Sequence, residues 1–223
     1  MYSRMSHQDC DCADRAVENT AEQTPNADGW IEERPVAAAG LPEAAADDMS
    51  RFFGESIESF DDMIAAFRDV VAGDGIAIDD LCHVEEETPH YARTDDQTYH
   101  FRCFYDGIAL AHLVDEPVEI GTETPTNEPV EIRASPESEI DVTPSEAVMS
   151  FGVATGSDVP ADDPPAAGDV YAAVCPYVKA FHTREEYERW AGEVAATTVG
   201  LPLESGVPIA AALTATNPPE AVE

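Results

Sequence analysis

The sequence predicts an α+β fold in which short, mainly antiparallel strands form small sheets packed with helices. Segments with apolar residues at helical spacing alternate with short runs of β-branched residues, and Pro, Asn and Thr turns separate those runs. Hydrophobic residues make up 43% of the 223 residues, which is enough for a folded core. This length suits one domain with a tail, or two very small domains.

Residues 1–48 are expected to form an acidic, mostly disordered tail that could end in a short helix, because they carry eleven acidic residues and three Arg without a sustained apolar period. Cys10 and Cys12 fall in this tail. The pair could bind a soft metal or exchange one with another site, but two thiols alone do not complete a tetrahedral site. Their role stays open.

Residues 49–98 are expected to form a short helical N-terminal segment. Its helix covers residues 60–71, where apolar residues recur at i, i+3, i+4, i+7 and i+11 from Phe60. Ser59 and Asp62 have the spacing of an N-cap residue and its N3 partner, so they are expected to start this helix.

Residues 99–217 are expected to hold most of the strands. Residues 99–103 alternate between apolar and polar side chains, which predicts a strand. The spacing of the apolar residues then changes to that of a helix, which predicts a buried helix that begins near Cys103. A capping box at residues 183–186 predicts the start of a later helix. The other predicted elements are strands over residues 118–120, 130–133, 139–142, 147–153, 170–178 and 197–201, and a final helix from residue 207.

The charge of the chain excludes some classes of partner. The 46 acidic and 11 basic residues give a net charge of −35, so nucleic acid and anionic membrane surfaces are not expected to bind. Ten of the basic residues are Arg and only one, Lys179, is Lys. Many acids with almost no Lys are typical of proteins that work in concentrated salt, which screens their self-repulsion. We therefore expect a halophilic protein and assign Lys179 no role.

The cysteines and the N-terminus indicate the compartment. No run approaches the roughly 20 apolar residues of a membrane span, and the N-terminus lacks the apolar core of a secretory signal. The five cysteines are too scattered for a disulfide framework, so a cytoplasmic protein with free thiols is expected. Cys82, His83 and His90 could form a metal cluster, but their spacing matches no known motif.

Two segments carry the residues best suited to chemistry. If a helix starts at Cys103, its peptide dipoles favour a thiolate there, and Asp106 follows about one turn later on the same side. A soft thiolate and a protonatable carboxylate would then share a pocket. Cys175 lies in a predicted strand, which Pro176 makes an edge or a bend that could expose the thiol. Either cysteine could equally be a small buried apolar residue, and Asp106 could be only a helix cap.

Residues of about 99–215 resemble the catalytic domain of the alkylmercury (organomercurial) lyases. The resemblance rests on four blocks that occur in the family's order: FRCFYDGIALAHLV, TNEPVEIRASPESEI, DVYAAVCPYVKAFHTREEYERWAGE and GVPIAAAL. It implies that Cys103 and Cys175 are the two essential cysteines, which bind mercury as substrate and product, and that Asp106 is the catalytic carboxylate. It also implies a lyase fold, no cofactor, and the conversion of R–Hg(+) to R–H and Hg(II), which small thiols or a mercuric reductase then accept.

The chain departs from the family in two places. The winged-helix segment that usually precedes the first catalytic cysteine is expected to be shortened or missing, and the family's additional cysteine has no counterpart between Cys103 and Cys175. Two other functions stay open. One is a non-enzymatic thiol protein that binds Hg(II) or Cu(I) as a carrier or sensor on the same scaffold. The other is a redox protein with a reversible Cys103–Cys175 disulfide.

Overall fold

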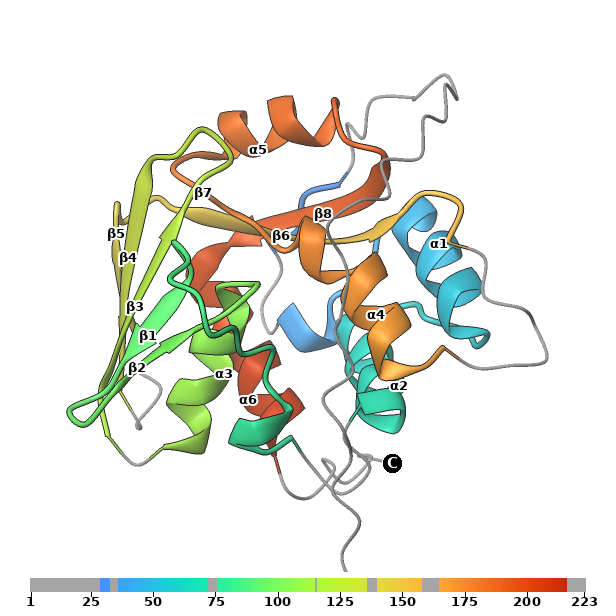
Figure 1. Ribbon diagram of the computed structural model, residues 1–223. Coiled ribbons are helices and arrows are strands. Elements are labelled where there is room, and N and C mark those ends of the chain that lie inside the picture. The colour runs from blue at the N-terminus through green and yellow to red at the C-terminus, as the bar shows by residue number, and fades with distance from the viewer. Residues whose placement is uncertain are drawn as a thin grey trace, which may run out of the picture.

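The computed structural model describes residues 29–32, 36–71, 76–114, 116–135, 140–157 and 165–215. In this part of the chain, two antiparallel sheets lie beside each other with helices between and around them (Figure 1). The α+β class with small antiparallel sheets is therefore confirmed. None of the described helices is both long and apolar enough to cross a membrane. Cys10 and Cys12 lie outside the described residues.

The larger sheet has five strands in the order β2-β1-β3-β4-β5. Burial alternates along β4, where Val130, Ile132 and Ala134 face inward, because one face of this sheet covers the core while the other meets solvent. Helix α3 packs on the inner face so closely that a Cβ atom at Gly107 would lie 2.9 Å from Ile120. The bounds are β1 Tyr91–Arg93, β2 Thr98–His100, β3 Val118–Glu123, β4 Pro129–Ala134, β5 Ile140–Thr143 and α3 Tyr105–Leu113.

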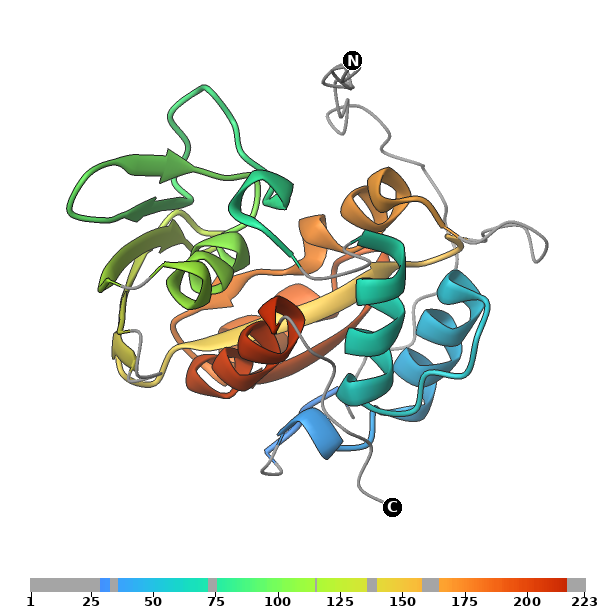
Figure 2. The same cartoon turned by 90° about the horizontal axis from the view of Figure 1, so that it is seen from below.

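The smaller sheet has the order β7-β6-β8 and is covered on both faces. Helix α5 lies on one face, and α1, α2 and α6 lie on the other (Figures 1 and 2). Six of the seven residues of β6 are buried, as expected for a strand with cover on both sides. The bounds are β6 Val148–Ala154, β7 Ala180–Phe181, β8 Ala196–Pro202, α1 Glu43–Phe53, α2 Phe60–Val71, α5 Arg184–Ala191 and α6 Val207–Thr214.

Both predicted helix starts are confirmed. The Ser59 backbone N–H donates to the Asp62 carboxylate at 2.9 Å, and the Asp62 N–H donates back to the Ser59 hydroxyl at 3.3 Å. Thr183 accepts in the same way from the Glu186 N–H at 3.3 Å. Helix α2 is then joined to α6 by Arg68, which is buried and donates from Nη1 to the Ala212 carbonyl oxygen at 2.7 Å.

The predicted strand over residues 170–178 is wrong. The structure has helix α4 at Ala167–Ala173 and a 3₁₀ helix at Cys175–Tyr177. A short apolar run fits a buried helix as well as a strand. In the structure, the segment starts as a helix whose first turn includes Asp169, which accepts from the Ala166 N–H at 2.9 Å. Helix geometry therefore sets the direction in which Cys175 points.

Two other boundaries differ from the prediction. The strand expected over residues 99–103 ends at His100, after which Phe101 forms only an isolated bridge with His83. In the segment expected as a tail, α1 begins at Glu43, and Trp30 bridges to Gly200 of β8. This part of the segment is folded because Ile31, Val36 and Ala45 are buried in the core. The many acidic residues around them gave no indication of that burial in the sequence. The division of the chain at residues 48 and 98 stays a prediction.

Candidate functional site

The three residues singled out in the sequence, Cys103, Asp106 and Cys175, line one cavity of about 70 Å³. Apolar side chains from three helices, from β6 and from the residues beside the 3₁₀ helix form most of its wall. They are Met49 and Phe53 of α1, Met63 and Phe67 of α2, Phe151 of β6, Leu213 of α6, and Val174 and Val178 on either side of the 3₁₀ helix, with Tyr105 and Tyr171 completing the lining. The cavity therefore places two sulfur atoms and one carboxyl group in an apolar surrounding.

Cys103 lies in the short connection between β2 and α3. Its side chain is 4% exposed, and its thiol faces the Val178 carbonyl oxygen at 4.0 Å. Helix α3 begins at Tyr105 with Phe104 as its N-cap residue, so Cys103 precedes the helix and does not open it as expected. The segment still directs the thiol into the cavity, because the residues on both sides of Cys103 are fixed: Phe104 is buried and the Arg102 N–H is bonded to Cys82.

Cys175 occupies the first position of the 3₁₀ helix that follows α4. Its thiol makes hydrogen-bonding contacts with the thiols of Cys103 and Cys82, and these contacts together with burial hold its pKa well above the usual value. Cys175 is therefore a neutral thiol at pH 7 until a soft cation displaces its proton. The described cysteines are all free thiols.

Asp106 sits in the first turn of α3, where it is half-buried and faces the same cavity. Burial raises the pKa of its carboxyl group to about 7, although a hydrogen bond donated by the Cys82 backbone N–H acts in the opposite direction. A carboxyl group with this pKa holds its proton in a large part of the molecules at neutral pH, so it can donate a proton to a group bound between the sulfurs.

Cys82 was not predicted as part of this site. It follows the 3₁₀ helix Ile78–Asp80 and lies 21 residues before Cys103, without a spacing that indicates a common site. The structure does not form the metal cluster considered for Cys82, His83 and His90. The His83 ring bonds to the Ile78 carbonyl oxygen at 2.6 Å, and the His90 ring bonds to the Thr122 hydroxyl at 2.7 Å.

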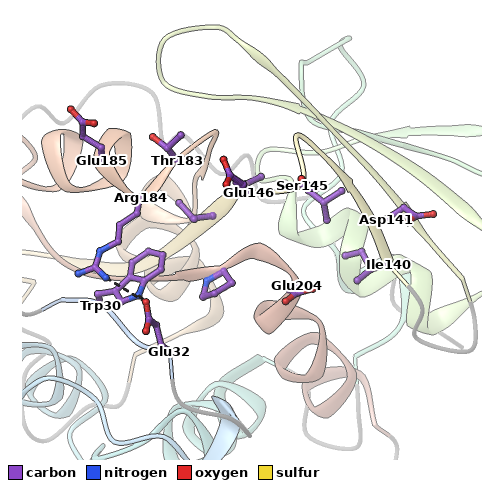
Figure 3. Close-up of a pocket in the computed structure, with 14 residues that line it drawn as sticks. Trp30, Glu32, Ile140, Asp141, Ser145, Glu146, Thr183, Arg184, Glu185 and Glu204 are labelled. Atoms are coloured by element: carbon purple, nitrogen blue, oxygen red, sulfur yellow. Dashed lines mark hydrogen bonds and ion pairs between the residues drawn. The ribbon is translucent and has the colours of Figure 1, made fainter.

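A larger cavity of about 640 Å³ lies at the start of α5 (Figure 3). Its charged residues are partly occupied with one another. The Arg184 guanidinium lies 4.6 Å from the centre of the Trp30 ring and 3.5 Å from the carboxylate of Glu32, to which Trp30 also donates at 2.9 Å. None of its lining residues is a cysteine, so size alone does not make it the reactive site.

The model of the family described as "MerB: Alkylmercury lyase" matches residues 84–215, which is more than half of the chain. One similar solved structure is titled "Crystal structure of the mercury-bound form of MerB2". It shares 15% sequence identity and a TM-score of 0.43, over 76% of this chain and 89% of that chain. No curated protein sequence matches this chain.

Proposed function

The chain belongs to the alkylmercury lyase family, and from this premise we propose that it is an organomercurial lyase that cleaves the carbon–mercury bond of R–Hg(+). One observation carries the proposal. Two thiols and a carboxyl group that can be protonated at neutral pH line one apolar cavity. A binding protein needs the thiols alone, whereas cleavage also needs a proton for the carbon atom.

The first step is the capture of the substrate by Cys103 and Cys175. Hg(II) is a very soft cation, and thiolate is the softest ligand that a protein offers. Each new Hg–S bond releases one thiol proton, and the small thiol that delivered R–Hg(+) leaves with one of them. The organic group then lies against the apolar wall, where Phe53, Met63 and Phe67 provide contacts without competing ligands.

The second step is protonolysis. Two thiolates on one R–Hg unit push electron density onto the carbon and weaken its bond to mercury. Asp106 then gives its proton to that carbon, R–H leaves, and Hg(II) stays on the sulfurs of Cys103 and Cys175 with the Asp106 carboxylate nearby as a further ligand. No electrons are gained or lost, and the carboxylate regains a proton from solvent.

The cycle ends when Hg(II) leaves. Small thiols or a mercuric reductase are the acceptors that suit this product, because both present thiolates to a soft cation. The proposed cycle suits a thiol-rich, reducing compartment such as the cytoplasm, which keeps the cysteine thiols reduced.

Headspace analysis for hydrocarbon release from methylmercury or phenylmercury, in excess small thiol and high salt, tests the proposal. Methane or benzene released in proportion to the protein supports it. Tight Hg(II) binding without hydrocarbon would instead support the carrier or sensor function. A titratable dithiol that cycles with a disulfide, again without hydrocarbon, would support the redox function.

A further inference from the structure

The thiols of Cys103, Cys175 and Cys82 form a row, with Cys175 in the middle. Cys175 neighbours both of the other thiols, since it lines the inner cavity with Cys103 and an outer cavity with Cys82. Cys103 is buried and lines the inner cavity, whereas Cys82 is partly exposed. The row therefore runs from the apolar chamber toward the surface of the protein.

A second cavity marks the outer end of this row. It has a volume of about 260 Å³ and is lined by Cys82, Arg102, Tyr171, Cys175 and Pro176. Cys175 and Tyr171 line both cavities, so the Cys175 sulfur stands where the chamber meets the outer pocket. The outer pocket has two sulfurs, and Arg102 adds a positive charge beside the path of an incoming thiolate.

The backbone around Cys82 is built into the site. The Arg102 N–H donates to the Cys82 carbonyl oxygen at 3.2 Å, and the Val84 N–H donates to the His100 carbonyl oxygen at 2.9 Å. The Cys82 N–H in turn donates to the Asp106 carboxyl group. These bonds fix Cys82 beside the segment that carries Cys103, so its thiol is placed by the fold and not by a free loop.

We propose that Cys82 and Cys175 form an outer Hg(II)-binding pair, which takes the product from the inner pair and presents it to an external thiol. The inference rests on the proposed function, since that reaction supplies the Hg(II). Cys82 lies two residues before the segment that matches the family model, so the family match does not include it.

The transfer is a balanced ligand exchange. The Hg–S bond to Cys103 breaks, an Hg–S bond to Cys82 forms, and the Cys82 thiol proton passes to the Cys103 sulfur. Cys175 stays bound throughout, so Hg(II) keeps two sulfur ligands at each end of the step. Two external thiols then remove Hg(II) from the outer pair and return their protons to Cys82 and Cys175.

Binding of Hg(II) alone to full-length variants tests the outer pair. All variants carry Cys10→Ser and Cys12→Ser, which removes the two other thiols. Cys103→Ser should keep one tightly bound Hg(II), because Cys82 and Cys175 remain. Adding Cys82→Ser should weaken binding about 100-fold or more, since even the loss of an outer-shell partner costs a metal site up to that factor. Serine at position 82 keeps the backbone N–H to Asp106, so only the sulfur is lost.

Competition against free cysteine, read by the ultraviolet sulfur-to-mercury absorption, gives both affinities. Equal affinities with and without the Cys82 sulfur would overturn the proposal. Cys103→Ala is a second inner variant in case the serine disturbs the buried site, and circular dichroism checks that each variant is folded.

The rate of product transfer tests the direction of the relay. A tethered thiol acts at an effective concentration of about 1 mM or more, so with the external thiol at about 0.1 mM, Cys82→Ser should slow the removal of Hg(II) about tenfold or more. An unchanged rate would overturn the relay. Hydrocarbon release by the unsubstituted protein is scored separately. If no hydrocarbon is released, the lyase proposal is refuted, and the Hg(II) affinities with and without the Cys82 sulfur still test the outer pair. If hydrocarbon is released but these affinities are equal, only the outer pair is refuted.

Discussion

Replacement of Asp106 by Asn separates proton transfer from mercury binding. Asparagine keeps the size of the side chain and an oxygen that can accept from the Cys82 N–H, but it has no acidic proton. Hg(II) should therefore still bind to Cys103 and Cys175. Cleavage of R–Hg(+) should fall by about 10²- to 10⁴-fold, which is the usual contribution of a positioned general acid.

The pH dependence gives a second measure of the same group. With a pKa of about 7, the Asp106 carboxyl group is protonated in about nine-tenths of the molecules at pH 6 and in about one-tenth at pH 8. Cleavage should then fall about tenfold between these values. Bound R–Hg(+) with two thiolates carries one net negative charge, which moves the midpoint upward, so the fall is expected at or above pH 7.

Single-turnover cleavage of a preloaded complex is the appropriate assay. The substrate is bound at one pH, the pH is changed rapidly, and the released hydrocarbon is measured over time. Both sulfurs are already bonded to mercury, so thiol ionisation does not contribute. Asp169→Asn is a matched control, because Asp169 caps the helix that leads to Cys175 but does not line the cavity. Equal rates in wild type and Asp106→Asn, or a rate that rises with pH, would refute the role of Asp106 as proton donor.

Three other outcomes follow from the structure. The raised pKa of Asp106 means that its ionisation weakens the fold as pH rises from about 4 to 7, so Asp106→Asn should unfold at higher urea than wild type at pH 8 but not at pH 4, with a difference of at most about 4 kcal/mol. The net charge of −35 should lower the melting temperature below roughly 0.5 M salt, and an unchanged value between dilute and molar KCl would argue against salt adaptation. The cavity of about 70 Å³ accepts a methyl group more readily than a phenyl group, since benzene occupies an engineered cavity of about 150 Å³. Phe67→Ala should therefore raise phenylmercury cleavage relative to methylmercury cleavage in single turnovers, and an unchanged ratio would mean that α2 does not limit the substrate.

Local patterns predicted the elements whose stability is local. The helix over Phe60–Val71 agrees with the structure in both bounds, because its apolar period and its Ser59–Asp62 cap act within the same few residues. The strands β3 to β6 agree to within a few residues, because turn residues separate their apolar runs in the sequence. The segment 170–178 failed because its apolar run is compatible with either periodicity, and only its packing on the core distinguishes them.

The residues of the candidate site were easier to predict where they lie close together in the sequence. Cys103 and Asp106 are three residues apart, so a helix start was enough to bring them together. Cys175 was noted for its place beside Pro176, but only the family resemblance joined it to Cys103, since 72 residues separate the two. Cys82 could not be found in this way, because its position depends on the hydrogen bond between its backbone and that of Arg102. The spacing of the cysteines in the sequence does not indicate this bond.

The contact between Arg68 and Ala212 has a consequence for the access of large substrates. It joins α2 to the last turn of α6, and these helices supply Met63, Phe67 and Leu213 to the chamber wall. Widening the chamber for a larger organic group by moving the two helices apart breaks a charged hydrogen bond worth about 1.5–3 kcal/mol. This bond alone reduces the open fraction by about ten- to a hundredfold. Since the acceptor is a neutral carbonyl oxygen and the guanidinium is buried, concentrated salt screens the bond little. The frequency of opening should therefore stay nearly constant over a range of salinity in which the surface charges respond strongly.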